Sequence, residues 1–490
     1  MQKRTIVSLV AASLFLTTST ALACTTVLVG KDQTVDGSYL VGRTVDAGVK
    51  DVCRMVLHPR RENKTGKYIS SCDKFTYPIP KKSLAYSSVP HLEDSNLWGE
   101  VGFNEAGAGM SATETIIPSA AVLAVDPFVK DTGAAESTIF NCVLPSVHTA
   151  REGAALLGKI VEEAGTSEGF GVAFVDTTGI WYLESAGGHR YLAVKVPDNK
   201  YFVTGNQGRL RDYDPQDRAN YMGSKDLISF AEKHNLYNPQ EGAFNFNKAY
   251  MNDTDKDHTY SYPRVWAMQH LLTPGITTKV EDGAKCPVFL AAEKKLSVND
   301  VKEVFRNHYT GTEHDPYLHS NPQEPYRPIS VFRCLNAHIQ QVRPELPLAI
   351  GRVTYIAFGM PSLGLYIPYY QGLESYLPAY TKGSQEASDD SAFWKYRKVQ
   401  TLAMSNYNSY APIVQKAYAD FEAATAVKQA KMEKGYLELY RSKPAQAQKL
   451  LQNFENEVMQ GGLDVADRVA NKIITQMTYD VGNKYLFHRE

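Results

Sequence analysis

The 490-residue sequence lacks an excess of charge of either sign. Its 52 Lys and Arg residues balance 53 Asp and Glu residues, which leaves a formal net charge of −1. A nucleic-acid-binding surface usually appears as an excess of basic residues, so nucleic acid is not expected as a partner. Beyond residue 23 the chain also lacks an apolar run long enough for a membrane helix. We therefore expect no membrane span.

Sequence motifs that hold metals or phosphates are absent as well. Asp253-Thr254-Asp255 is not followed by the rest of an EF-hand loop, and His314-Asp315 lacks the spacing of a zinc site. No glycine-rich loop with phosphate-binding spacing occurs. We expect no metal and no cofactor.

The first 23 residues have the three parts of a secretory signal. Lys3 and Arg4 form a charged start, residues 6–16 are apolar, and Ala21-Leu22-Ala23 is a cleavage site of the A-x-A type. We expect cleavage after residue 23 and export to the periplasm or the extracellular space. The mature chain then begins at Cys24.

The chain has six cysteines, which is in keeping with export because disulfides persist in oxidising compartments. If the cysteine at the mature N-terminus is catalytic, it stays free and an odd number remains. Spacing does not fix connectivity. The pairing that we favour is Cys53 with Cys72 and Cys286 with Cys334, with Cys142 buried and free.

Two apolar segments, residues 24–30 and 39–46, flank Asp36-Gly37. Gly tolerates a positive φ and Asp bonds its own backbone, so this dipeptide is typical of a turn. We expect an antiparallel strand pair with Cys24 at its free end.

A cysteine at the mature N-terminus carries a nucleophile and a base on one residue. The α-amine has a reference pKa of roughly 7.7–8.0, so it can accept the thiol proton near neutral pH. Two other interpretations of Cys24 are a structural cysteine and a lipid anchor. A lipidation signal normally has Leu three residues before the cysteine, whereas this chain has Ala21 there and Leu22 one place late.

Arg43 and Asp46 end the strand that is expected to pair with the Cys24 segment. An arginine there can stabilise a thiolate, and a carboxylate can accept hydrogen bonds from the α-amine. Arg-x-x-Asp is a weak signal by itself, and its plain alternative is a surface ion pair.

Further along, residues 150–164 have helical spacing, and apolar alternation predicts strands at 171–176, 180–184, 191–196 and 201–204. Helices are expected at 227–234, 264–272 and 298–309, and strands at 330–332, 337–342 and 353–358. A helix followed by several antiparallel strands indicates an α+β fold.

Beyond about residue 389 the pattern is helical, with segments 393–410, 412–430 and 444–459 and a stop at Gly461-Gly462. We expect a signal peptide at 1–23, a catalytic domain at 24–388 and a helical region at 389–490. Long amphipathic helices there are compatible with covering a cleft or with a contact between copies in a homo-oligomer.

Several motifs occur in order along the chain: Cys24-Thr25-Thr26, Gly42-Arg43 with Asp46, residues 102–107, residues 204–209, residues 262–266 and residues 306–312. Together they resemble the cysteine dipeptidases of the N-terminal nucleophile (Ntn) hydrolase superfamily, to which bile-salt hydrolases and penicillin V acylases are more distantly related. The resemblance covers roughly residues 24–370, and Asn307 replaces the family's Asp in the last motif.

The resemblance implies an αββα sandwich of two antiparallel sheets and a hydrolase of dipeptides, which the signal segment predicts to be exported. It also implies that Asn206 donates to the oxyanion and that Arg264 organises the site. Glu114 lies near the second oxyanion Asn of bile-salt hydrolases, but an ionised carboxylate cannot donate. We expect Glu114 to bind the substrate α-amine instead. His308 is expected to be structural.

Two alternative functions remain open at this point. One is hydrolysis of N-acyl amides or conjugated bile salts within the same superfamily. The other is a lipid-anchored surface binding protein.

Overall fold

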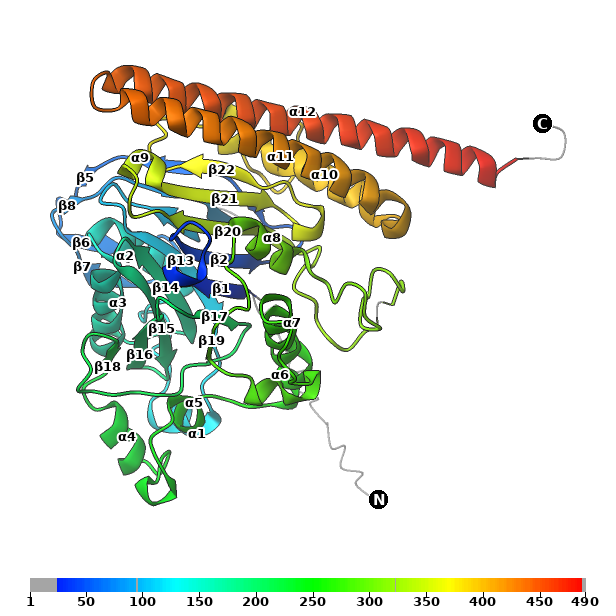
Figure 1. Ribbon diagram of the computed structural model, residues 1–490. Helices are drawn as coiled ribbons and strands as arrows, with labels where there is room; N and C mark the ends of the chain where they lie inside the picture. Colours follow the sequence, from blue (N-terminus) through cyan, green and yellow to red (C-terminus); the bar gives the residue numbers. More distant parts are fainter. Residues whose placement is uncertain (1–23, 94–95, 322, 487–490) are drawn as a thin grey trace, which may run out of the picture.

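The computed structural model describes residues 24–93, 96–321 and 323–486, which form two main antiparallel sheets with helices packed on them (Figure 1). This arrangement confirms the α+β class. The first sheet has the order β19-β17-β1-β2-β20-β21-β22. Its strands are β1 (Thr25–Val29), β2 (Tyr39–Asp46), β17 (Tyr201–Thr204), β19 (Phe289–Leu290), β20 (Cys334–Val342), β21 (Arg352–Phe358) and β22 (Ile367–Tyr370).

The second sheet has the order β12-β13-β14-β15-β16-β18. Its strands are β12 (Val101–Phe103), β13 (Gly109–Thr115), β14 (Phe170–Asp176), β15 (Gly179–Ala186), β16 (Arg190–Lys195) and β18 (Tyr221–Gly223). Short strands between residues 52 and 99 form smaller sheets beside them. These are β3 (Val52–Cys53), β4 (Val56–His58), β5 (Arg61–Glu62), β6 (Lys67–Ile69), β7 (Thr76–Pro78), β8 (Lys82–Ser83), β9 (Tyr86–Ser88), β10 (Pro90–Glu93) and β11 (Asn96–Gly99).

The helices before the C-terminal region are α1 (Ala120–Val125), α2 (Glu136–Val143), α3 (Ala150–Ala164), α4 (Leu227–Lys233), α5 (Phe246–Tyr250), α6 (Asp255–Tyr260), α7 (Tyr262–Leu272), α8 (Val298–Arg306) and α9 (Leu348–Gly351). The bounds of α3 agree with the predicted helix. Its first turn is closed by Thr149, whose side chain accepts a hydrogen bond from the Glu152 N–H, and its apolar stripe is buried.

The strand pair β1–β2 is confirmed. It is antiparallel with Thr25 opposite Thr44 and Val27 opposite Gly42. Gly37 in the connection has φ +69°, the left-handed conformation that glycine adopts without strain. Continued by one residue, this register places Cys24 beside Val45, one position from Asp46.

The strands predicted at 171–204 do not all belong to one sheet. β14, β15 and β16 pair in sequence in the second sheet, whereas β17 crosses to the first sheet and pairs with β1, with Thr26 opposite Thr204. This crossing carries the segment that follows Thr204 to the end of β1 where Cys24 lies.

Alternation along β1 and β2 determines what covers each face of the first sheet. Leu28 and Val41 pack toward the second sheet, in one apolar cluster with Val175. Val27 packs on the opposite face, in a cluster that includes Phe305 of α8. In the second sheet the far face packs on α2 and α3, which lie at the left of Figure 1.

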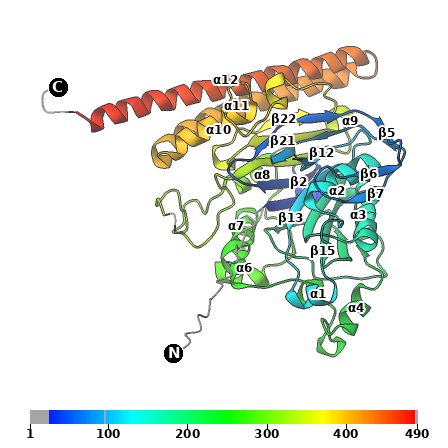
Figure 2. The ribbon, with the colours of Figure 1, turned by 180° about the vertical axis from the view of Figure 1, so that it is seen from behind.

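The C-terminal region contains α10 (Ala392–Met404), α11 (Tyr407–Leu439) and α12 (Pro444–Lys484). Figures 1 and 2 show α11 and α12 side by side along the top of the molecule, above β21 and β22. The helices share an apolar cluster with the sheet. Below them on the first sheet lies the strand β1 that carries Cys24.

Three predictions about the last third of the chain are wrong. Residues 330–332 form no strand, and β20 begins only at Cys334. The predicted helix 393–410 is two helices, because Asn406 caps a new one by accepting from the Ser409 N–H. Gly461-Gly462 does not end α12. A Cβ on Gly462 would lie 2.6 Å from Ile367 Cδ1, so this glycine permits close packing on β22.

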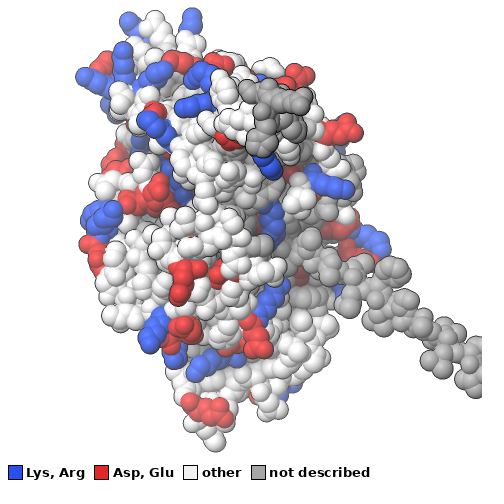
Figure 3. Space-filling view, turned by 90° about the vertical axis from the view of Figure 1, so that its right-hand side faces the viewer, with Lys and Arg blue, Asp and Glu red and all other residues white. Residues whose placement is uncertain are grey.

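The surface carries both signs of charge. On the face shown in Figure 3, acidic and basic side chains are interspersed. Within the residues that the structure describes, no helix is both long and apolar enough to cross a bilayer.

Candidate active site

Cys24 lies at the start of β1 with only 1% of its surface exposed. Arg43 of β2, also 1% exposed, donates from Nη1 to the Cys24 Sγ at 3.3 Å. The predicted contact between these two residues is therefore present. In an antiparallel pair the side chains of neighbouring strands meet on one face, which is how two segments 19 positions apart converge.

The guanidinium of Arg43 is fixed on all sides. Its Nε donates to Ser111 Oγ at 3.0 Å, Nη1 donates to the Thr113 carbonyl at 2.7 Å, and Nη2 forms an ion pair with Glu100 Oε2 at 2.6 Å. These partners come from β13 and from the residue before β12, in the second sheet. Arg43 thus bridges the two sheets beneath the thiol.

Glu100 is a site residue that the sequence analysis missed. It is fully buried, and behind it His91 Nδ1 lies 3.9 Å from Glu100 Oε1, while His91 Nε2 lies 3.2 Å from Asp51 Oδ2. Burial raises the pKa of Glu100, and the charges of Arg43 and His91 oppose that rise. The one sequence signal for Glu100 was the presence of a charged residue inside a segment with the pattern of a strand.

Arg264 binds the backbone of the predicted nucleophile from α7. It is fully buried, and its Nη1 donates to the Cys24 carbonyl at 2.5 Å and to Thr25 Oγ1 at 2.8 Å. Its Nη2 donates to Asn206 Oδ1 at 2.8 Å. Since the amide oxygen of Asn206 accepts from Arg264, the amide nitrogen, which is a donor, is directed elsewhere.

The loop that carries Asn206 is held by another buried carboxyl group that the sequence analysis missed. Glu184 of β15 accepts hydrogen bonds from the backbone N–H groups of Arg209 and Leu210 at 2.7 and 3.1 Å. Burial raises the pKa of Glu184 to about 7, although these two N–H groups and the charge of Arg209 oppose the rise. The second sheet therefore positions this loop against β1.

Asp46 is fully buried and forms an ion pair with Arg327, a residue that the sequence analysis did not single out. Arg327 belongs to the long segment between α8 and β20. In the full chain the nitrogen of Cys24 is part of a peptide bond. An α-amine for Asp46 to orient exists only after cleavage before Cys24.

Glu114 of β13 lies beside β1, the strand that follows Cys24. It is fully buried, and Thr26 of β1 donates from Oγ1 to Glu114 Oε1 at 2.5 Å. Burial raises the pKa of Glu114 to about 8, with Thr26, Arg43 and Arg264 acting in the opposite direction. Among the described residues its second oxygen, Oε2, has no hydrogen-bond partner.

The thiol of Cys24 is neutral in this environment. Burial raises its pKa well above the usual value, Arg43 acts in the opposite direction, and the carboxyl groups of Glu114, Glu136 and Glu100 add to the rise. A buried neutral thiol is a poor nucleophile, because the reactive form is the thiolate.

Both predicted disulfides are wrong, because none of the six cysteines forms a disulfide. Cys53 and Cys334 are buried, and each thiol donates to a nearby backbone carbonyl, that of Leu335 and that of Asn336 respectively. Sequence spacing says nothing about the distance between Cα atoms that a disulfide requires. Cys142 is buried and free, as predicted.

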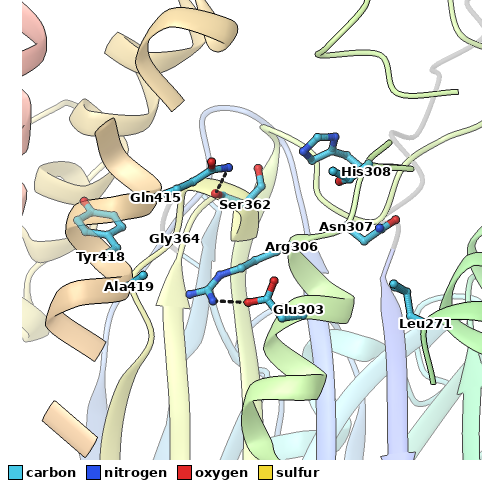
Figure 4. A pocket seen from close by; sticks show the side chains of 11 residues that line it. Leu271, Glu303, Arg306, Asn307, His308, Ser362, Gly364, Gln415, Tyr418 and Ala419 are labelled. Carbon is cyan, nitrogen blue, oxygen red and sulfur yellow. Dashed lines mark hydrogen bonds and ion pairs between the residues drawn. The ribbon is translucent and has the colours of Figure 1, made fainter. Parts of the chain in front are cut away.

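A cavity of about 510 Å³ lies away from these groups, between α8 and α11 (Figure 4). It is lined by Arg306, His308 and Gln415 among others, and by none of the predicted site residues. His308 Nδ1 bonds to Asp315 Oδ1 and its Nε2 bonds to the Tyr407 hydroxyl, each at 2.9 Å. Both ring nitrogens are therefore engaged, which agrees with a structural role.

The described ranges contain no cluster of three His, Cys, Asp or Glu residues arranged to hold a metal ion. The structure does bring four predicted residues into direct contact around the start of β1. Arg43 and Arg264 each bond to Cys24, and Asn206 is joined through Arg264. Asp46 and Glu114 flank this group.

Known proteins resemble this chain over most of its length. A probable dipeptidase of Salmonella dublin is 51% identical over 363 residues, which cover 74% of this chain and 84% of the relative. A probable dipeptidase of Latilactobacillus sakei is 34% identical over 412 residues, covering 82% and 84%. A solved structure of a variant of conjugated bile acid hydrolase from Clostridium perfringens aligns with 68% of this chain and with 89% of the hydrolase chain. The sequence identity is 11% and the TM-score is 0.26, which are too low to carry a structural argument.

The sequence model of peptidase family C69 matches residues 23–420, which is most of the chain. The match begins beside Cys24 and includes every predicted site residue. The chain is thus a hydrolase of peptide bonds, and it belongs to peptidase family C69.

Proposed function

We propose that this peptidase is an exported dipeptidase whose nucleophile is the thiol of Cys24 at a newly formed N-terminus. The observation that carries the proposal is that two arginines bind Cys24: Arg43 donates to its sulfur and Arg264 donates to its carbonyl oxygen. The names of the relatives, which are dipeptidases or probable dipeptidases, support the substrate class.

Cleavage after Ala23 gives Cys24 an α-amine, and this amine is the base that the neutral thiol requires. The amine accepts the thiol proton, and the thiolate attacks the peptide carbonyl to form a C–S bond. When the tetrahedral intermediate collapses, the C–N bond breaks and the leaving amine takes the proton. Water then attacks the thioester, with the α-amine again as base, and releases the acid and the thiol.

The charges that develop in this reaction have partners in the site. The Asn206 amide oxygen accepts from Arg264, which fixes the orientation of the amide, and we assign its N–H donor to the oxyanion. Arg43 stabilises the thiolate. Asp46 orients the α-amine by accepting a hydrogen bond from it, and this new contact replaces part of the ion pair between Asp46 and Arg327.

Glu114 is the group that we assign to the α-ammonium of the substrate. Its oxygen Oε2 has no hydrogen-bond partner within the described ranges, and its position beside Thr26 places a carboxyl group next to β1. A bound ammonium favours the ionised carboxylate, so substrate binding shifts the pKa of Glu114 downward from about 8. The change Glu114→Gln is expected to raise the KM of a dipeptide and to have little effect on an N-acylated substrate.

The finer architecture is part of the same proposal. Helices α7 and α8 pack on one side of the first sheet, the second sheet packs on the other, and α2 and α3 cover its far face. We assign this order of layers to the αββα sandwich of the Ntn hydrolases. The division at residue 388 and the export of the chain remain predictions.

Two measurements test the nucleophile. Mass spectrometry of the mature protein should show an unmodified N-terminal Cys24, and protein that keeps residues 1–23 should be inactive. Cys24→Ala should abolish hydrolysis of a dipeptide panel, whereas Cys72→Ser, at a half-buried cysteine outside the site, should not. Activity retained in Cys24→Ala, or a lipid on Cys24, refutes the mechanism. Cleavage of acyl amino acids but not of dipeptides replaces the substrate class with the amidohydrolase alternative.

A further inference from the structure

Three arginines contact Tyr260, the last residue of α6. The Cζ atoms of Arg264 and Arg327 each lie 5.2 Å from the centre of this ring. Arg333 donates from Nη2 to the Tyr260 hydroxyl at 2.6 Å. The sequence motifs account for Arg264 alone, and the other two arginines come from the segment between α8 and β20.

This cluster lies directly beside the catalytic group. Arg264 bonds to the Cys24 carbonyl, and Arg327 forms an ion pair with Asp46. The carbonyl of Arg333 accepts from the Ala47 N–H at 3.2 Å, which fixes Arg333 next to the end of β2. Arg264 is fully buried and the side chain of Arg327 is only 9% exposed, whereas Tyr260 and Arg333 are half-buried. Tyr260 and Arg333 are thus the more exposed members of the cluster.

The cluster carries more positive than negative charge. Arg264 and Arg333 hold carbonyl, amide and hydroxyl oxygens, and within the described residues neither forms an ion pair with a carboxylate. The charge of Arg333 also contributes to the lowered pKa of Arg327, after burial, which shows that the two guanidinium groups are close. In the mature enzyme the α-ammonium of Cys24 competes for Asp46, which increases the excess.

Backbone hydrogen bonds fix the segment that carries Arg327 and Arg333 at each of these two residues. The Arg327 N–H donates to the Thr259 carbonyl at 3.1 Å, beside Tyr260, and Arg333 is tied to Ala47 as described. The guanidinium groups are therefore presented by backbone that is fixed to α6 and to β2. A guanidinium group held in this way binds a carboxylate through two parallel N–H···O bonds.

We propose that Arg333, together with Arg327 on the ring of Tyr260, binds the C-terminal carboxylate of the dipeptide. This assignment rests on the proposed function and deepens it. Glu114 and the arginine cluster then contact opposite ends of the substrate, so that a peptide with one residue after the scissile bond is favoured. A substrate without a free carboxylate at that place leaves the cluster uncompensated.

The test compares one dipeptide with the same dipeptide carrying a C-terminal amide, using the purified mature enzyme. The wild type should cleave the free acid with a kcat/KM at least about tenfold higher. Arg333→Met should raise the KM of the free acid about tenfold and leave that of the amide unchanged, so the preference disappears. Arg333→Lys should retain part of the preference, since it keeps the charge but loses the two-pronged geometry.

A matched control is Arg441→Met, because Arg441 also donates to a tyrosine hydroxyl, that of Tyr440, on the exposed end of α11. This variant should behave like the wild type. If the wild type cleaves acid and amide equally, or if Arg333→Met and Arg333→Lys weaken both substrates equally, the carboxylate assignment is overturned while the dipeptidase proposal stands. If the wild type cleaves neither dipeptide, the proposed function fails and this assignment fails with it.

Discussion

Gly462 offers a sharp test of how closely α12 packs on the body of the protein. A Cβ at this position would lie 2.6 Å from Ile367 Cδ1 of β22 and 2.6 Å from the Tyr396 hydroxyl of α10. That hydroxyl shares a 2.8 Å hydrogen bond with the Tyr380 hydroxyl, which also donates to the Met459 carbonyl of α12. The change Gly462→Ala therefore forces two buried groups apart.

The expected size of the effect follows from two opposing contributions. Overpacking of a well-packed core costs about 1–3 kcal/mol. Replacing Gly by Ala inside a helix gains up to about 1 kcal/mol. We expect Gly462→Ala to lower the free energy of unfolding by about 1–2 kcal/mol, because the two contacts are too short to relax cheaply.

Gly482 provides the control within the same helix. A Cβ there would meet no heavy atom of the described residues within 4 Å, so Gly482→Ala keeps the helical gain without the steric cost. Equilibrium denaturation with urea, followed by circular dichroism, should give a lower midpoint for Gly462→Ala and an equal or higher midpoint for Gly482→Ala, with unchanged slopes. If both variants shift the midpoint in the same direction by the same amount, the close packing of α12 at Gly462 is refuted.

Three further predictions concern the site and the thiols. Glu100→Gln leaves the Arg43 cation buried without its ion-pair partner, so kcat/KM should fall at least about tenfold. Glu100→Asp should recover part of this loss. If Glu100→Gln changes neither the rate nor the pH–rate profile, Glu100 has no positioning role. The pKa of Glu114 is raised from 4.5 to about 8, so this group leaves the free energy of unfolding undiminished below pH 4.5 and lowers it as the pH rises toward 8. Glu114→Gln should therefore be more stable than the wild type at pH 8 by roughly 4 kcal/mol and equal to it near pH 4.5. Unfolding curves at the two pH values test this, with exposed Glu62→Gln as control. Thiol titration of the denatured, unreduced protein should find six free thiols, and a count of two would restore the predicted disulfides.

What could be predicted from the sequence is what local pattern encodes. The pairing of β1 with β2 follows from apolar strands around a glycine turn, and it alone places Arg43 beside Cys24. Helix α3 follows from an apolar stripe with a capping threonine. Asn206 and Arg264 were found through ordered motifs, and the structure joins them by a hydrogen bond.

What could not be predicted depends on contacts between distant segments. Glu100 lies 57 positions from Arg43, and no local pattern indicates that they pair. Arg327 lies in a loop without periodicity, so its contact with Asp46 could not be expected. The glycines of α12 fit a helix stop in sequence terms, but packing against β22 overrides that local preference.

The crossing of β17 to the first sheet has a consequence for biosynthesis. Strand β1, which follows Cys24, has β17 on one side and β2 on the other, and β2 in turn pairs with β20, which ends at Val342. Such long-range pairing forms late, because large loops must close first. A growing or truncated chain that stops before β20 holds the cysteine but neither the completed sheet nor the arginines beyond residue 320. Peptide-cleaving activity is thereby withheld until nearly the whole catalytic part has been made.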